Sequence, residues 1–375
     1  MSGSTIKRGK NSWRIKFELA PDPTTGRRRY HMETVRCANR TEAKLELAKR
    51  MADLAEGRYV TPTKMTVATY AKHWLDNIAP AKRAPITIER YATLIRAHIV
   101  PGLGAEELQK LDGTAINIFY ASLKDRAPHT RHHIHSLLKM ILASAVKAKK
   151  VAQSPIADIE TAPKPKNLKK IEVLDEAELA ALLDHLKGHW LYVPTLIAAS
   201  TGLRRGEVLG LRWRDVDFAR GILQVTQKVE KVGGKLGIGR PKTDRSSRTI
   251  KMPADLGDAL RHHRKQQIEQ RLKLGLGGKP EFVITNPLGK MLDPDTLSDA
   301  FSTKAEAVKP GHTFHCLRHT HLTLLLKAGV PVHVVSARAG HAKPSITLDT
   351  YSHLLGGEDN DAAKQADAIL KRVLK

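Results

Sequence analysis

The chain has 375 residues, 41% of them hydrophobic, so two or three domains with proper cores are expected. We expect neither a membrane span, which needs about eighteen consecutive apolar residues, nor a signal peptide, because no apolar stretch of either kind is present. Two cysteines, Cys37 and Cys316, are too few for a disulfide framework or a thiolate zinc site. An intracellular soluble protein is therefore predicted.

The net charge of +25 is spread along the whole chain. Basic residues (Lys and Arg) outnumber acidic ones (Asp and Glu) in every part of the chain. The counts are 14 to 7 in residues 1–61, 16 to 8 in residues 62–167 and 33 to 23 in residues 168–375. A disordered basic tail would concentrate the excess in one place. The distribution favours nucleic acid as a partner, and the alternative is a basic protein with a merely solvated surface.

The first sixty residues predict a small β-sheet followed by a helix. Alternation in SWRIKF places its apolar side chains on one face of a strand, and the turn DPTTG leads into a second, basic strand at 27–35. Arg27, Arg28 and Arg29 could enter a DNA groove, as β-ribbon readers do, or could simply be solvated. Thr41 is expected to cap a helix that ends near Ala55.

Residues 64–158 are expected to be helical. Thr87 is the expected cap of a second helix in this block, and a fourth helix is predicted from His129 to Lys150. His132, His133 and Lys139 lie outside the apolar stripe of that fourth helix. The cluster HTRHHIH contains no Cys, Asp or Glu, so contact with phosphates is preferred to a metal site.

A Pro- and Lys-rich stretch at 159–170 is typical of a linker, and a large mixed domain follows it. That domain opens with a capping-box pattern from Asp175 to Glu178 and contains a β region near 221–252. Helices are predicted around 255–273, 295–308 and 314–328, with a final amphipathic segment at 360–374.

TGLRRGE places Arg204 and Glu207 three residues apart at the start of a helix. An arginine there can reach a phosphate while the carboxylate orients its guanidinium, although Glu207 alone could equally be a surface ion-pair partner. Lys242, in RPKTD, is expected at the tip of a hairpin. Alone it would be an ordinary exposed lysine.

HTFHCLRHTH suggests a metal site at first, but Arg318 would repel a divalent cation. His315, Arg318 and His319 lie at i, i+3 and i+4 on one helix face. His319 is predicted to shape the same site, and His321 to be a buried structural histidine. His341 and Tyr351 follow, and a tyrosine in such a polar segment is, alone, usually a surface residue.

Together these residues resemble the signature of the tyrosine site-specific recombinases, the phage integrase family. The matching motifs are TGLRRGE with Arg204, PKT with Lys242, HCLRH with His315 and Arg318, GH with His341, and DTYSH with Tyr351. They span residues 201–353, no element of the signature is missing, and the resemblance extends over nearly the whole chain.

The resemblance implies a metal- and ATP-independent strand transfer with no cofactor. Tyr351 would be the nucleophile that forms a 3′-phosphotyrosyl bond, with His315 as general base and Lys242 as general acid. Arg204, Arg318 and His341 would stabilise the phosphate, and Glu207 would hold the first arginine.

The resemblance also implies a multidomain, mainly α fold with small β-sheets. An arm-type DNA-binding domain (1–61) would precede a helical, SAM-like core-binding domain (62–160), a linker (161–170) and a mixed α/β catalytic domain (171–375) with a C-terminal oligomerisation helix. The expected partners are double-stranded DNA at core-type and arm-type attachment sites, three further copies in a tetramer, and accessory DNA-bending and directionality proteins. The expected location is the cytoplasm or nucleoid of a bacterial host.

Three alternatives remain open. A type IB topoisomerase uses the same chemistry without exchanging strands, but the helical block and the arm-like start favour recombination. A DNA-binding protein that kept the fold without catalysis would not need Tyr351. A zinc nuclease using the histidines of 312–321 would need acidic or thiolate ligands, which that stretch lacks.

Overall fold

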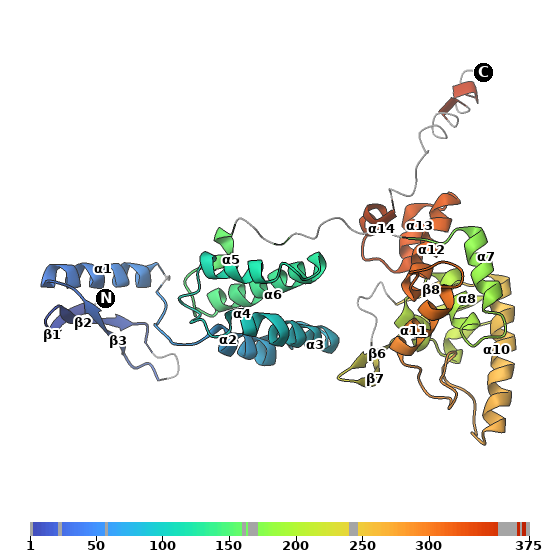
Figure 1. Ribbon diagram of the computed structural model, residues 1–375, viewed down its shortest axis with the longest axis horizontal. Helices are drawn as coiled ribbons and strands as arrows, with labels where there is room; N and C mark the ends of the chain where they lie inside the picture. Colours follow the sequence, from blue (N-terminus) through green and yellow to red (C-terminus); the bar gives the residue numbers. More distant parts are fainter. Residues whose placement is uncertain are drawn as a thin grey trace. The chain divides into compact units, whose positions relative to one another are not determined.

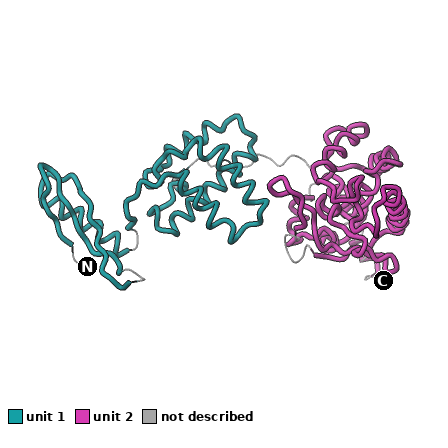
Figure 2. Tube along the Cα trace, turned by 90° about the horizontal axis from the view of Figure 1, so that it is seen from below, with its two compact units in different colours: residues 1–167 teal, residues 168–375 magenta. Residues whose placement is uncertain are grey.

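The computed structural model describes residues 3–21, 25–56, 59–159, 163, 172–239, 247–351, 366–367 and 370–372. The chain divides into two compact units, Met1–Asn167 and Leu168–Lys375, which Figure 2 colours separately. No helix in these described ranges combines the length and apolarity needed to cross a membrane.

Unit 1 begins with an antiparallel sheet in the order β1-β2-β3, covered on one face by α1 (Figure 1). The elements are β1 (Gly3–Gly9), β2 (Ser12–Leu19), β3 (Arg29–Arg36) and α1 (Arg40–Ala55). The predicted alternation in β2 is observed, with Trp13, Ile15 and Phe17 buried beneath α1. The predicted cap is wrong, because the side chain of Asn39, not Thr41, accepts the amide hydrogen of Glu42.

The basic residues of this sheet lie in two places. Arg27 and Arg28 precede β3 and are exposed, so the strand starts two residues later than predicted, at Arg29. On the face opposite α1, the ammonium of Lys16 lies 4.2 Å from the centre of the Tyr30 ring. Arg14 is on that face too, since it alternates with the buried Trp13 and Ile15.

A helical block follows in the same unit. It consists of α2 (Val67–His73) and α3 (Pro85–Leu94), extended by π-helical turns Trp74–Ile78 and Ile95–Ile99, then α4 (Val100–Leu103), α5 (Gly113–Ser122), α6 (Pro128–Lys147) and a 3-10 turn, Pro155–Asp158. Thr87 is not a cap: α3 starts at Pro85, whose fixed φ suits the first helical position.

Helix α6 presents an apolar face to the core of this block and a basic face outside it. Ile134, Leu137 and Ile141 are fully buried, whereas Lys139 is exposed. His132 and His133 are half-buried, and both make hydrogen bonds within the protein. Nδ1–H of His132 donates to the carbonyl of Pro163 at 3.0 Å, and Nε2 of His133 lies 2.6 Å from Nε2 of His129.

Unit 2 combines helices with two small sheets (Figure 1). Strands β4 (Val216–Asp217), β5 (Ile222–Val225) and β8 (Arg248–Lys251) form one antiparallel sheet, and β6 (Lys228–Val232) pairs with β7 (Lys235–Gly239). The helices are α7 (Glu176–His185), α8 (Tyr192–Thr201), α9 (Arg205–Gly210), the 3-10 turn Trp213–Asp215, α10 (Ala254–Lys273), α11 (Pro294–Ala305), α12 (Phe314–Lys327), α13 (Val332–Ala339) and α14 (Pro344–Tyr351).

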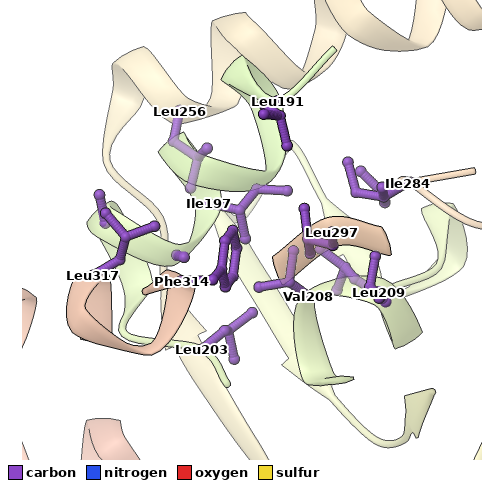
Figure 3. Packing of buried hydrophobic residues seen from close by; sticks show 14 of the residues in the cluster. Leu191, Ile197, Leu203, Val208, Leu209, Leu256, Ile284, Leu297, Phe314 and Leu317 are labelled. Atoms are coloured by element: carbon purple, nitrogen blue, oxygen red, sulfur yellow. The ribbon is translucent and has the colours of Figure 1, made fainter. Parts of the chain in front are cut away.

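Helix α12 is central to unit 2 because it contributes to two cores. Its start carries Phe314 and Leu317 into the main core, where they meet Ile197 of α8 and Leu203 (Figure 3). Its C-terminal half packs with α13 and with Tyr351 in a smaller cluster. The predicted capping box at the start of α7 is present. Most of the predicted tail segment 360–374 lies outside the described residues.

Candidate active site

Arg204 and Glu207 stand where α8 ends and α9 begins. Gly202 terminates α8 in the left-handed conformation, with φ 70°, and a Cβ there would lie 2.8 Å from Cδ2 of His321. Glu207 then accepts two hydrogen bonds from Arg204, one from the backbone amide and one from Nη1, each at 3.0 Å. The carboxylate therefore fixes both the start of α9 and the Arg204 guanidinium.

The same carboxylate pairs with Arg248 of β8, a residue outside the sequence motifs. Nη2 and Nη1 of Arg248 lie 3.0 and 3.3 Å from the two Glu207 oxygens, and both side chains are only 6% exposed. Arg248 also donates from Nε to the carbonyl of Arg338 at 2.7 Å, which ties β8 to α13. Burial pushes the pKa of Glu207 upward, but Arg248 and Arg204 outweigh burial and hold that pKa below its ordinary value.

Arg318 is held at the junction of two helix ends. It is 2% exposed, and its Nη1 and Nη2 donate to the carbonyls of Gly202 and Ala339 at 2.6 and 2.7 Å. Burial, and then the nearby charge of Arg204, lower its pKa to about 9, so it stays charged at neutral pH. Three arginines around one buried carboxylate leave excess positive charge, which suits an anion.

Tyr351, the last residue of α14, lies against α12. It is 1% exposed, and its hydroxyl oxygen is 2.6 Å from Nδ1 of His319. Burial raises the pKa of Tyr351 to about 12 and lowers that of His319 to about 4, the latter helped by the charges of His315 and Arg318. At neutral pH a protonated phenol therefore meets a neutral imidazole.

The other histidines of the site have different surroundings. His315 keeps an exposed surface, although its ring packs edge-on against His319 at 4.8 Å between centroids. His341 follows the end of α13, and its Nδ1 lies 2.8 Å from the Thr347 hydroxyl. His321 is the structural histidine that the sequence predicted: Nδ1–H donates to the Ala199 carbonyl and Nε2 accepts from Arg338.

Comparisons with known proteins identify the family. Residues 172–357 match the model of the phage integrase family. The chain belongs to the phage integrase family. The resemblance inferred from the sequence motifs is thereby confirmed.

Relatives of this integrase-family chain match it over most of its length. A protein named tyrosine recombinase XerC-like from Caldanaerobacter subterraneus is 28% identical over 382 residues, covering 96% of each chain. The integrase of Mycobacterium phage D29 is 26% identical and covers 88% of each chain.

Solved structures share the fold. The Tn1549 transposon integrase superposes with a TM-score of 0.68 at 19% identity, covering 80% of this chain and 99% of that one. A lambda integrase gives 0.58 at 17% identity, covering 92% of this chain and 93% of that one. The predicted multidomain, mainly helical fold class is confirmed.

Most predicted site residues in unit 2 come together. Arg204, Glu207 and Arg318 meet where α8 ends, and Tyr351 adjoins them through His319. Burial, and then the charges of Arg318 and Arg204, lower the pKa of His341. Lys242 lies outside the described residues. The proposed DNA contacts, Arg27 to Arg29, His132, His133 and Lys139, all belong to unit 1.

Two contacts differ from the sequence-based expectation. His319, rather than His315, approaches the Tyr351 hydroxyl. Arg248 could have been found from strand alternation: it shares a face of β8 with buried Ile250, and a charge facing inward needs a buried partner. Across residues 3–21, 25–56, 59–159, 163, 172–239 and 247–351, no group of three or more His, Cys, Asp or Glu side chains could hold a metal ion.

Gly340→Ala should destabilise the protein by disturbing Arg248, the buried partner of Glu207. Gly340 has φ 67°, and a Cβ would lie 3.0 Å from Nη1 of Arg248, so alanine would be strained and would displace the Glu207 partner. We expect the free energy of unfolding to fall by about 1–3 kcal/mol. Denaturant titration measures it, and Gly329→Ala, at φ 78° with open space around its Cβ, is the control for backbone strain alone.

Acid should destabilise unit 2 before its carboxylates titrate. Burial is the first cause that lowers the pKa values of His319, His321 and His341 to about 4, against an ordinary 6.5. Between those values the unfolded chain binds protons that the folded chain does not, so stability falls as pH falls from about 6.5 towards 4. The unfolding temperature at pH 7, 6 and 5 tests this. His321→Asn should flatten the slope, and His333→Asn, at an exposed position of α13, should not.

Proposed function

We propose that this chain is a site-specific DNA recombinase that cuts and rejoins strands through a 3′-phosphotyrosyl bond on Tyr351. One observation carries the proposal: the Tyr351 hydroxyl is hydrogen-bonded to His319. His319 directly follows Arg318 in the motif HCLRH, which lies within the region that matches the family. A tyrosine used only for packing would not require a buried arginine cluster beside it.

The chemistry follows from the charges of the site. Attack on a phosphodiester builds negative charge on the non-bridging oxygens, and Arg204 and Arg318 supply two permanently charged guanidinium groups to stabilise it. His341 is a third donor in the proposal. Glu207 keeps Arg204 oriented through two hydrogen bonds.

The leaving 5′-oxygen needs a proton, and Lys242 is the proposed general acid. His315 is proposed to contact the phosphate region from its exposed face. The phosphotyrosyl bond keeps the energy of the bond that was broken, so rejoining requires neither ATP nor a metal ion. We therefore propose that no cofactor takes part.

The proposed substrate is double-stranded DNA at attachment sites. The described Tn1549 and lambda integrase structures hold DNA, and one lambda integrase structure is a tetramer on a Holliday junction. For this chain we propose residues 1–61 as the arm-site domain, 62–160 as the core-binding domain, 161–170 as a linker and 171–375 as the catalytic domain. Arg27, Arg28, Arg29, His132, His133 and Lys139 are the proposed DNA contacts.

The proposed DNA contacts of unit 1 lie on the sheet and on α6, and they are not equally well supported. The face of the sheet away from α1 carries Arg14, Lys16 and Tyr30, in addition to the nearby arginines. His132 and His133 are already hydrogen-bonded within the protein, so Lys139 is the stronger candidate on α6. A tetramer on DNA, accessory bending and directionality proteins, and a place in the bacterial cytoplasm or nucleoid complete the proposal.

Covalent trapping tests the proposal. The protein is incubated with nicked duplexes made from the DNA that flanks its gene, in which cleavage releases a short strand and leaves the complex trapped. The expected product is a covalent complex whose DNA-bearing peptide contains Tyr351 and whose DNA carries a free 5′-hydroxyl. An adduct on another residue would disprove the assignment, and relaxation of supercoiled DNA at random sites without recombinants would indicate a type IB topoisomerase.

A further inference from the structure

The nucleophile of the proposed reaction is hydrogen-bonded to a histidine. Nδ1 of His319 lies 2.6 Å from the Tyr351 hydroxyl oxygen, and the two rings are tilted with centroids 5.7 Å apart. Tyr351 is 1% exposed, so bulk water is a poor alternative acceptor for its proton. The phenol must transfer that proton to a group already beside it.

The other two histidines of the site are less suited to accept this proton. His341 has its Nδ1 engaged by the Thr347 hydroxyl at 2.8 Å. His315 packs against His319 rather than Tyr351 and keeps an exposed surface. Geometry therefore favours His319 as the proton acceptor, whereas the family resemblance implies His315 as the general base.

We propose that His319 is the proton acceptor for Tyr351, taking the phenolic proton as the phosphotyrosyl bond forms and returning it when that bond is broken. The inference rests on the proposed function. His319 touches the reacting oxygen, so it would be a catalytic residue.

The step balances without a co-reactant. Tyr351 Oη forms a bond to phosphorus, and its proton moves to Nδ1 of His319. The P–O5′ bond breaks with its electron pair on O5′, which takes a proton from the proposed acid, Lys242. In the rejoining step a 5′-hydroxyl attacks phosphorus and gives its proton back to the neutral amine of Lys242. The P–Oη bond breaks with its electron pair on Oη, and His319 returns its proton to that phenolate oxygen.

Charges around His319 make this transfer depend on DNA. The charged or titratable groups that act on His319 or contact it are His315 and Arg318 on its own helix, His341 after α13 and Tyr351 of α14. Arg204, Glu207 and Arg248 in turn act on Arg318. Burial and the cationic neighbours depress its pKa to about 4 in the protein alone. A phosphodiester brings a negative charge that opposes those cations, so the imidazole becomes a stronger base when substrate is present.

A pH profile of single-turnover cleavage tests the inference. The suicide duplex is used with wild-type protein and with His319→Asn, whose amide oxygen can accept the hydrogen bond but cannot take the proton. The wild-type rate should reach a plateau above about pH 6.5, the ordinary histidine pKa. The variant should be about a hundredfold slower at pH 7, and its rate should keep rising with pH as the phenolate fraction grows.

A substrate with a sulfur leaving group distinguishes the role of general base from the role of general acid. When sulfur replaces the bridging 5′-oxygen, the departing thiolate needs no proton. His319→Asn should remain slow on this substrate, whereas Lys242→Ala should regain the wild-type rate. Recovery of His319→Asn on the sulfur substrate would place His319 at the leaving group and overturn the inference.

Two further variants fix the interpretation. His333→Asn, the same substitution at an exposed position of α13, should match wild type. If His315→Asn removes the plateau while His319→Asn keeps it, or if His319→Asn cleaves as fast as wild type or faster, His319 is not the acceptor. In those cases wild-type protein still forms the covalent complex, whereas its failure to form one would contradict the proposed function itself.

Discussion

Tyr351→Phe is expected to abolish the covalent protein–DNA complex while the protein still folds and binds DNA. The substitution removes one oxygen, the proposed nucleophile, so cleavage should fall by at least about ten-thousandfold, as it does when other enzymes lose their nucleophile. Nδ1 of His319 loses its partner, which should lower the free energy of unfolding by about 1–3 kcal/mol. Gel electrophoresis under denaturing conditions measures the complex, and gel shift measures binding.

The matched control is Tyr192→Phe at the start of α8. Tyr192 belongs to the same unit and packs against its main core, so the same atom is removed at a distance from the nucleophile. We expect that variant to cleave at the wild-type rate. A residual covalent complex in Tyr351→Phe would show that another side chain attacks, and the Tyr351 assignment would be wrong.

Local features of the fold were accessible from the sequence. The capping box at Asp175 depends on residues three positions apart, and the end of α8 depends on one glycine that can adopt a positive φ. Both signals are local, so no tertiary information was needed. The two wrong caps at Thr41 and Thr87 are also local: Asn39 caps the first helix two residues earlier, and Pro85 starts the other helix two residues before Thr87.

Tertiary pairings within the site were not accessible in the same way. The spacing of His315, Arg318 and His319 puts all three on one helix face, but it cannot say which histidine faces a tyrosine on another helix. Packing of α12 against α13 and α14 decides that His319 does so. Arg248 and Glu207 are 41 residues apart, and only the fold of β8 against α9 makes them partners.

The positive charges clustered in the site suit an anion, but their mutual repulsion opposes folding. Arg318 and Arg204 are the arginines proposed to bind phosphate, and Arg248 adds a further buried charge. Glu207 is the carboxylate that hydrogen-bonds both Arg204 and Arg248. Removing it would leave two guanidinium groups near each other without that partner, and like charges at short range in a desolvated site repel strongly.

Glu207→Ala should therefore destabilise unit 2 by about 3–5 kcal/mol, the usual cost of breaking a buried ion pair by removing one partner. Both side chains of the Glu207–Arg248 pair are 6% exposed, so solvent screens little of the effect. Arg204 would also lose the carboxylate that orients it, and cleavage should slow. Denaturant unfolding and single-turnover cleavage measure the two effects separately.

A double-mutant cycle distinguishes electrostatic pairing from loss of packing. Arg248→Met removes the buried charge but keeps much of its apolar volume, so Glu207→Ala with Arg248→Met should be less destabilised than the two single variants added together. The expected coupling is about 2 kcal/mol. Additive effects would mean that the carboxylate acts by filling space. Because the pKa of Glu207 is lowered in the folded state, its stabilising effect is lost as pH falls below about 4.5, and Glu207→Gln should lose that part of the acid dependence.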